Sequence, residues 1–338
     1  MKIKVFLEST RDFAEHQLLC KFYESIPEET TVDWELTDIE SEIMHKEIDI
    51  GDSYSDCDIA VMFGSWKPRE KGHHLVRNAI VQNAPCFIMF ETPLLRRSVH
   101  KVNDYYRVGV NGFLNNQGSF TPNKLNYSND RLLNKLKLSW DGWKQNSQGH
   151  ILMLLQLPGD ASLRGTDIYN WLNTCIGDIR EQTNKKIVIR PHPLSPMRET
   201  DLFFKTVTEL YMEGIKNIEV SDPSIKSLKE DLNGAYCSVT FTSGSAVDSI
   251  MAGIPTVATD PGNFAWDIST NFCDEINNVL LEDPKTVQQW LSNLAYYQWD
   301  TTEIKSGAVW KHIWEVAFHE LRHKKAQDIL RAEKGKKK

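Results

Sequence analysis

The chain has 338 residues, of which 41% are hydrophobic and 25% charged, and its formal net charge is −7. This composition is typical of a globular protein with two domains, and the acidic balance argues against a generally basic nucleic-acid-binding surface. No apolar run reaches the ~18 residues that a transmembrane helix needs, the N-terminus does not resemble a signal peptide, and the six scattered cysteines fit reduced thiols, so a cytoplasmic protein is expected.

The first half of the chain alternates predicted strands and helices. Strand patterns cover 3–7, 32–36, 59–63 and 86–90, and helical patterns cover 13–22 and 74–82. This βαβ alternation predicts a parallel sheet. Residues 111–148 are rich in Asn, Ser, Gly and Gln, which indicates loops and the connection between domains.

The second half repeats the alternation. The predicted strands are 151–157, 186–190, 217–221 and 237–241, and the predicted helices are 166–182, 199–212 and 224–232. A short helix follows the last of these strands, and a Gly-Ile-Pro sequence leads from it into a further apolar run. A long final helix over 308–330 places Trp310, Trp314 and Phe318 on one face, where they should pack on a domain surface.

Three predicted strands of the second half end in polar residues, and the carboxyl ends of parallel strands form the ligand-binding edge of an open sheet. These residues are Gln156, Gly159 and Asp160 at or after the end of the first strand, Arg190 and His192 at or after the end of the second, and Ser243, Gly244, Ser245 and Asp248 after the third.

The serine turn 243–245 precedes a helix, where backbone N–H groups and the helix dipole favour an anion, and Gly244 would allow a close backbone approach. A guanidinium from Arg190 and an imidazole from His192 also suit a phosphate. An ordinary N-cap serine and a proline-bracketed loop with a satisfied histidine are the structural alternatives.

Taken as a set, these motifs resemble the capsule polysaccharide synthesis family of glycosyltransferases, which includes bacterial enzymes that transfer the acidic sugar Kdo. The resemblance covers about the C-terminal half of the chain. Asp248 stands where the family commonly has a glutamate, which shortens a side chain that the resemblance implies contacts the donor sugar. The matching residues are Gln156, Pro158, Gly159 and Asp160, then Arg190, Pro191, His192 and Pro193, then Ser243, Gly244, Ser245, Gly253 and Pro255.

Two Rossmann-like halves joined by a linker predict an α/β fold of the GT-B type, with two Rossmann-like domains whose parallel sheets face a cleft. The expected divisions are an N-terminal acceptor domain, a C-terminal nucleotide-sugar donor domain, and a long helix with a basic tail. Their bounds are 1–148, 149–305 and 306–338.

The predicted function is transfer of a sugar from a nucleotide-sugar donor to an acceptor hydroxyl, with a glycan as the expected acceptor. The serine turn and His192 would hold the donor phosphates, and Asp160 or Glu91, which follows strand 86–90, would deprotonate the acceptor. The Asp-x-Asp sequence at 56–58 lies at the amino end of its strand, so no obligatory metal is expected. No cofactor is expected either, because the nucleotide sugar is a substrate.

Other functions stay open: glycosylation of a hydroxymethylated DNA base, epimerisation of a sugar nucleotide, or non-catalytic binding of a nucleotide or glycan. Residues 320–338 carry eight Lys or Arg against three acids, a net charge of +5, which allows contact with DNA phosphates. The acidic remainder of the chain disfavours it. The sequence does not predict the oligomeric state.

Overall fold

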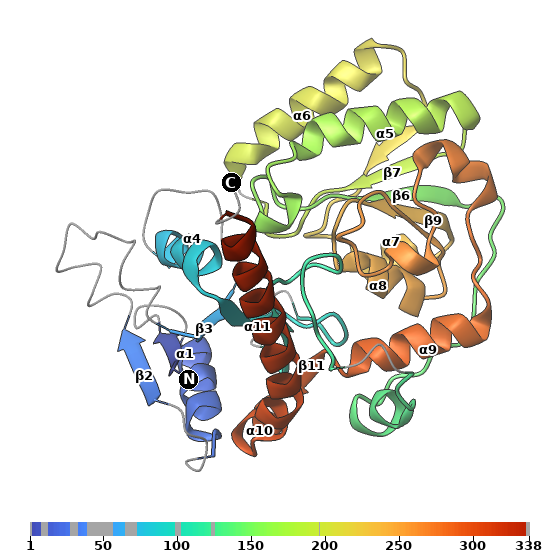
Figure 1. Ribbon diagram of the computed structural model, residues 1–338. Coiled ribbons are helices and arrows are strands. Elements are labelled where there is room, and N and C mark those ends of the chain that lie inside the picture. Colours follow the sequence, from blue (N-terminus) through green and yellow to red (C-terminus); the bar gives the residue numbers. More distant parts are fainter. Residues whose placement is uncertain are drawn as a thin grey trace. The chain divides into compact units, whose positions relative to one another are not determined.

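The computed structural model describes residues 2–7, 13–27, 33–38, 57–64, 73–98, 103–122, 126–195 and 197–335. The chain packs as two compact units (Figure 1). The first consists of Met1–Phe113, Gln117–Tyr127 and Asn293–Lys338, and the second of Leu114–Asn116 and Ser128–Ser292.

The first unit contains a six-stranded sheet in the order β11-β5-β4-β3-β1-β2. β1 to β4 are parallel, as predicted. β5 pairs antiparallel with β4, and β11 pairs antiparallel with β5; neither of these two strands was predicted from the sequence. The strands are β1 (Lys2–Leu7), β2 (Asp33–Asp38), β3 (Ile59–Phe63), β4 (Cys86–Glu91), β5 (Tyr105–Val110) and β11 (Gln298–Asp300).

Aromatic packing joins the first unit's helices to its sheet. The ring of Phe22 lies 5.0 Å from that of Phe90 and 6.0 Å from that of Trp310, both edge-on. Trp310 therefore packs in the core of the first unit, in agreement with the packing face predicted for its helix. The helices are α1 (Phe13–Glu24), α4 (His73–Asn83), α10 (Thr301–Lys305) and α11 (Ala308–Gly335).

The units differ in their bounds from the expected 1–148, 149–305 and 306–338. Residues from Asn293 onward return to the first unit because β11 pairs with β5 and α11 packs against β4 and β5. The side chain of Gln298 on β11 is fully buried and accepts the backbone N–H groups of Leu94 and Leu95 at 2.9 and 3.0 Å. A three-residue strand carries no periodic pattern, so this return was not predicted.

The segment before β6 belongs to the second unit. Trp140 Nε1 donates to the carbonyl of Ile250 at 2.7 Å, and Trp143 Nε1 donates to that of Glu282 at 2.9 Å. Gly253 has φ +79°, and a Cβ there would lie 2.5 Å from the carbonyl oxygen of Gly142. These contacts hold the irregular segment against the unit although it has little regular structure.

The second unit contains a five-stranded parallel sheet in the order β10-β9-β6-β7-β8. Its first strand, β6, is central, β7 and β8 lie on one side, and β9 and β10 lie on the other. The strand order reverses between β6 and β9, which is the topological switch point where open α/β sheets bind ligands. The strands are β6 (His150–Leu154), β7 (Ile187–Arg190), β8 (Ile218–Val220), β9 (Ala235–Thr240) and β10 (Thr256–Ala258).

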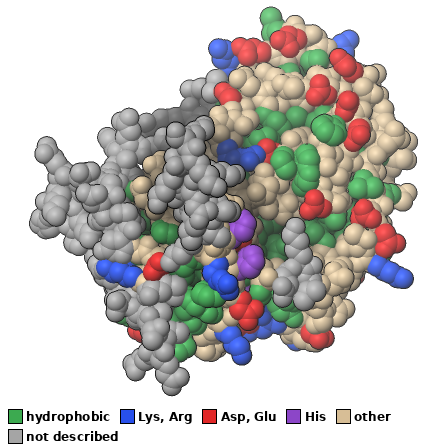
Figure 2. All heavy atoms as spheres, in the orientation of Figure 1, with side chains coloured by type: hydrophobic (Ala, Val, Ile, Leu, Met, Phe, Trp, Pro, Cys, Tyr) green, Lys and Arg blue, Asp and Glu red, His purple; other side chains and the backbone are tan. Residues whose placement is uncertain are grey.

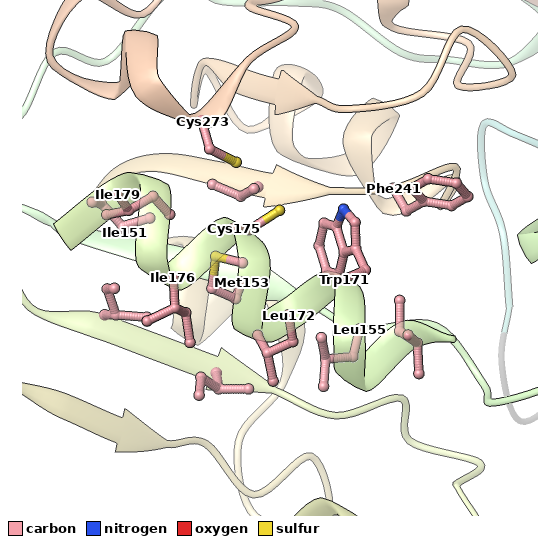
Figure 3. Packing of buried hydrophobic residues seen from close by; sticks show 14 of the residues in the cluster. Ile151, Met153, Leu155, Trp171, Leu172, Cys175, Ile176, Ile179, Phe241 and Cys273 are labelled. Carbon is pink, nitrogen blue, oxygen red and sulfur yellow. The ribbon is translucent and has the colours of Figure 1, made fainter. Parts of the chain in front are cut away.

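Helices cover both faces of this sheet. Alternate residues of β6 divide between them. Ile151 and Met153 pack in the cluster that includes α5 (Figure 3). Leu152 and Leu154 pack with Leu232 of α7. α5 begins where Asp167 accepts the backbone N–H groups of two residues in its first turn. The helices are α5 (Ile168–Gln182), α6 (Met197–Met212), α7 (Leu228–Leu232), α8 (Ser245–Met251) and α9 (Pro284–Ala295).

Short turns complete the unit. They are a π-helix at Arg131–Lys135 and 3₁₀ helices at Ala161–Leu163, Trp266–Ile268 and Cys273–Asn278. In the described part of the chain, no helix combines the length and the apolar character that crossing a bilayer requires.

Candidate functional site

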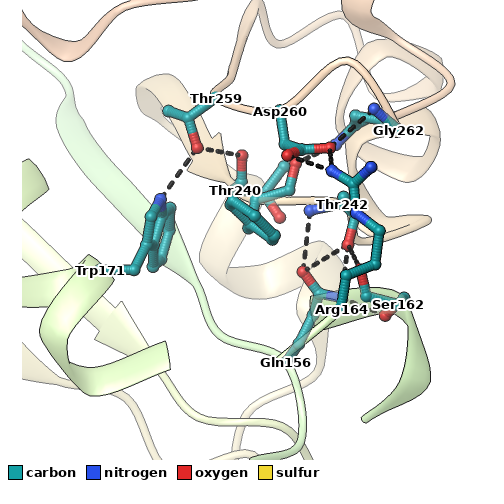
Figure 4. A network of polar contacts seen from close by, with 11 residues as sticks. Gln156, Ser162, Arg164, Trp171, Thr240, Thr242, Thr259, Asp260 and Gly262 are labelled. Carbon is teal, nitrogen blue, oxygen red and sulfur yellow. Dashed lines mark hydrogen bonds and ion pairs between the residues drawn. The ribbon is translucent and has the colours of Figure 1, made fainter. Parts of the chain in front are cut away.

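A polar network joins the strand ends at the switch point of the second sheet (Figure 4). Gln156, which follows β6, is 6% exposed. Its Oε1 accepts the backbone N–H of Thr242 at 2.9 Å, and its Nε2 donates to the hydroxyls of Thr242 at 3.0 Å and Ser162 at 2.5 Å. The amide of Gln156 is therefore satisfied within the protein and fixes the loop after β6 to the loop after β9.

Asp160 begins the 3₁₀ helix Ala161–Leu163. Its Oδ1 accepts the backbone N–H of Ser162 at 2.9 Å and the Ser162 hydroxyl at 2.7 Å. The sequence did not reveal this capping role, because the helix is a single turn with no periodic signal. Oδ2 has no hydrogen-bond partner among the described residues, so half of the carboxylate remains available to a ligand. Gly159 precedes it at φ +69°, a turn conformation that favours glycine.

The serine turn follows β9 at the same edge. Ser243 Oγ accepts the backbone N–H of Ser245 at 3.2 Å, and the next two backbone N–H groups bond to the carbonyls of Ser243 and Gly244. The backbone N–H groups of Ser243 and Gly244 themselves have no acceptor in the described part of the chain. Gly244 has φ −59°, which any residue can adopt, so the backbone does not require glycine there. Asp248 lies half-buried in the first turn of α8.

His192 lies half-exposed in the loop after β7. Its Nδ1 accepts the backbone N–H of Leu194 at 3.1 Å, and its carbonyl accepts that of Ser195 at 2.9 Å. Because Nδ1 accepts a hydrogen bond, the proton of the neutral ring is on Nε2. The imidazole is thus oriented by its own loop, with Nε2 as the donor.

Arg190, the last residue of β7, is occupied by structural partners. Its guanidinium is 7% exposed and pairs with Asp231 of α7 at 2.5 Å, and Ser221 Oγ donates to the same carboxylate oxygen at 2.5 Å. A buried charge of this kind is stabilised by its partner and does not depend on a ligand. The structure therefore gives no support to a direct phosphate contact by Arg190.

Glu91 ends β4 in the first unit. Its Oε1 accepts the backbone N–H of Thr92 at 2.8 Å, and its cross-strand neighbour is Arg107. Burial lowers the pKa of the Arg107 guanidinium to about 10, while the negative charge of Glu91 opposes this change. Glu91 therefore also helps to stabilise a buried cation.

The structure reveals members of the network that the sequence interpretation missed. Arg164 pairs with Asp260, whose Oδ1 also accepts the backbone N–H of Gly262 at 2.7 Å. Thr242 and Ser162 complete the contacts with Gln156. Ser162 lies two residues after a carboxylate in a turn, which is a recognisable capping signal, but Arg164 and Asp260 are 96 positions apart and share no local pattern.

No group of three or more His, Cys, Asp or Glu side chains among the described residues could hold a metal ion. Asp58 of the Asp-x-Asp sequence accepts the backbone N–H of Lys2 at 2.9 Å, at the amino end of β3 as expected. Asp56 lies outside the described residues.

No protein-family profile and no curated protein matches the sequence. The structure is similar to KpsC of Thermosulfurimonas dismutans, a beta Kdo 2,7 transferase, with a TM-score of 0.50 and 15% identity over 92% of this chain and 100% of that one. It is also similar, at a TM-score of 0.40 and 11% identity, to a mutant O-GlcNAc transferase of Thermobaculum terrenum, over 96% of this chain and 67% of that one. For Anabaena HepE, solved with UDP and glucose, the TM-score is 0.37 and the identity 12%, over 92% of this chain and 99% of that one.

The similarity to KpsC extends over nearly the whole of both chains and agrees with two Rossmann-like units. The chain therefore has the GT-B glycosyltransferase fold. At 15% identity the similarity concerns the fold, and it does not assign a capsule family, a donor or an acceptor.

Proposed function

We propose that this chain is a nucleotide-sugar-dependent glycosyltransferase that transfers a sugar to an acceptor hydroxyl of a glycan. The observation that supports this most is the polar network at the switch point of a parallel sheet in a GT-B fold. In it Gln156 bonds to Thr242, which directly precedes the serine turn, and to Ser162, whose backbone N–H is capped by Asp160. In this proposal the second unit binds the donor and the first unit binds the acceptor.

The donor phosphates would bind at the serine turn. The backbone N–H groups of Ser243 and Gly244 donate to no acceptor among the described residues, and both residues are half-exposed. Backbone donors at a strand-to-helix turn stabilise the charge that develops on a leaving phosphate, and the Nε2 proton of His192 would add a third donor. Gln156 and Arg190 support this site through the fold, because their polar groups are bonded within the protein.

The acceptor hydroxyl would lose its proton to a carboxylate. Asp160 fits this role because Oδ1 is held by Ser162 while Oδ2 has no partner among the described residues, so the side chain is oriented and one oxygen can accept a proton. Glu91 is the other candidate. One of its oxygens is already bonded to Thr92, and Arg107 lies across the strand.

The acceptor is proposed to be a glycan rather than DNA. On the face shown in Figure 2, the visible Lys and Arg side chains of the described residues are scattered and form no continuous basic surface. DNA binding depends on such a surface, and outside residues 320–338 the net charge is −7 − 5 = −12, which repels DNA phosphates. Deleting 334–338 should therefore leave turnover unchanged, and salt-dependent DNA binding that weakens on this deletion would favour a DNA base as acceptor.

The first test is a screen of purified protein for thermal stabilisation by UDP, CMP, GDP and their sugars. A ligand at 100 times its Kd stabilises the native state by about 2.7 kcal/mol, enough for a clear shift in Tm. Product analysis with the best donor alone then separates the functions. A changed sugar on intact nucleotide would indicate an epimerase, and binding without any turnover would indicate a non-catalytic module.

The second test concerns the serine turn. Replacing both Ser243 and Ser245 with leucine should abolish nucleotide binding while the protein remains folded. Ser249→Ala is the matched control, because Ser249 lies in the same helix, is fully buried, and its hydroxyl donates to the carbonyl of Ser245 at 2.9 Å. Equal nucleotide affinity in the folded double variant and the control would remove the serine turn from the site.

A further inference from the structure

An ion pair joins two loops at the carboxyl edge of the second sheet. Arg164 Nη2 donates to both carboxylate oxygens of Asp260. Arg164 follows the 3₁₀ helix that Asp160 begins, and Asp260 follows β10 (Figure 4). The pair therefore connects the loop that carries Asp160 to a strand end that lies two strands away in the sheet order.

The backbone of Arg164 shows that its loop is constrained. Arg164 has φ 52° and ψ 35°, in the left-handed region where a residue with a Cβ is disfavoured. Such a conformation persists where surrounding contacts determine it, and these residues occur often at functional sites. Asp260 is itself oriented by the backbone N–H of Gly262, so the carboxylate offers Arg164 a fixed partner.

The loop has a second anchor. Gln156 binds both Ser162 in this loop and Thr242 after β9. The loop is thus attached to the end of β9 through Gln156 and to the end of β10 through Arg164. Asp160 lies between these two residues in sequence. Because the side chains of Arg164 and Asp260 are 33% and 13% exposed, their pairing adds little to global stability.

We propose that Arg164 and Asp260 form a positioning pair that holds the loop carrying Asp160 in the geometry needed for sugar transfer. This proposal rests on the proposed function. Neither residue contacts the reacting atoms in it. Arg164 acts through the loop, and Asp260 acts through Arg164.

The test compares variants of the full chain by hydrogen–deuterium exchange over 157–166. Arg164→Met removes the charge but keeps most of the stem, and Asp260→Asn keeps an acceptor for Gly262. Both should speed amide exchange of this segment by about tenfold, the effect of losing roughly one hydrogen bond of local free energy. Arg164→Lys should restore part of the protection, and exchanging the two charges in a double variant should restore more than either single change.

Thr259→Val is the matched control. It removes the bond from Trp171 Nε1 to Thr259 Oγ1 (2.9 Å), which joins α5 to the loop after β10 without involving 157–164. It should leave exchange over 157–166 unchanged. Equal exchange in Arg164→Met and the wild type would overturn the proposal.

Kinetics then separate positioning from simple support of the fold. With a sugar nucleotide found in the donor screen, Arg164→Met should lower kcat by about tenfold or more and leave the donor KM and the Tm nearly unchanged. A looser loop with an unchanged kcat would overturn the positioning role. If the wild type transfers sugar from none of the nucleotides, the proposed function fails, and the exchange data still decide whether the pair holds the loop.

Discussion

Removing either member of the buried pair Arg190 and Asp231 should destabilise the second unit strongly. Their side chains are 7% and 3% exposed, and Ser221 donates to the same carboxylate oxygen. Deleting one partner of such a pair leaves an uncompensated buried charge and costs about 3–5 kcal/mol. For a unit of this size, about 1 kcal/mol lowers the Tm by roughly 2–4 °C, so Arg190→Met should lower it by roughly 6–20 °C.

The double variant Arg190→Met with Asp231→Leu should recover much of this loss, because two apolar side chains replace the pair without leaving a charge behind. Lys186→Met is the matched control. Lys186 precedes the same strand and pairs with Glu219, but their side chains are 46% and 43% exposed, so its loss should cost at most about 1 kcal/mol.

The assay is thermal and urea denaturation of the four variants at pH 7, together with binding of the nucleotide selected by the screen. A structural pair predicts a large loss of stability in each single variant and recovery in the double variant. A different result would refute this reasoning: if Arg190→Met keeps the wild-type Tm within about 2 °C and loses nucleotide binding, the guanidinium contacts the ligand.

Further predictions concern other groups. Asp160→Asn keeps an acceptor for Ser162 but removes the proposed base, so it should bind donor and fail to transfer, with Glu91→Gln as the parallel measurement; near wild-type turnover in both would exclude both as the base. His192→Ala should lower transfer by about tenfold or more at an unchanged Tm, and a lower Tm with normal turnover would indicate a structural histidine. Burial raises the pKa of the Cys86 thiol from 9.0 to about 12. The free energy of unfolding that comes from keeping this thiol neutral is therefore fully present below pH 9 and is lost as the pH rises toward 12. In denaturation series across this range, Cys86→Ala should lose about 1.4 kcal/mol per pH unit less than the wild type, and parallel curves would contradict the assignment.

The sequence predicted most of the second sheet because its strands are continuous apolar runs separated by helices of ordinary length. β6, β7 and β9 and their polar ends lie where the pattern placed them. β5 and β11 were missed for a different reason. β5 contains Arg107 and a glycine within a short run, and β11 has three residues, so neither carries a period that would identify it.

The site was predicted less completely than the fold. Sequence position indicates which residues end a strand, but it does not indicate whether a polar side chain at that place turns toward a ligand or toward the protein. The side chain of Arg190 pairs with Asp231, 41 residues later, and that of Gln156 bonds to Thr242, 86 residues later. Both partners depend on the packing of the whole unit, so no local pattern could reveal them.

The polar residues at the carboxyl edge of the second sheet are of two kinds, which differ in burial and in whether their hydrogen-bonding groups have partners within the protein. Gln156 and Arg190 are buried, and their partners are protein atoms, so changing them should alter stability before it alters chemistry. Asp160 is half-buried, and one of its carboxylate oxygens is bonded while the other has no partner among the described residues. The serine turn likewise offers two backbone N–H groups that have no acceptor among the described residues. An unsatisfied polar group is tolerated where solvent or a ligand can reach it. A sugar donor would therefore bind at residues of the second kind. If substitutions of Gln156 lowered turnover more than substitutions of Asp160 in variants of equal stability, this assignment of the two kinds would be wrong.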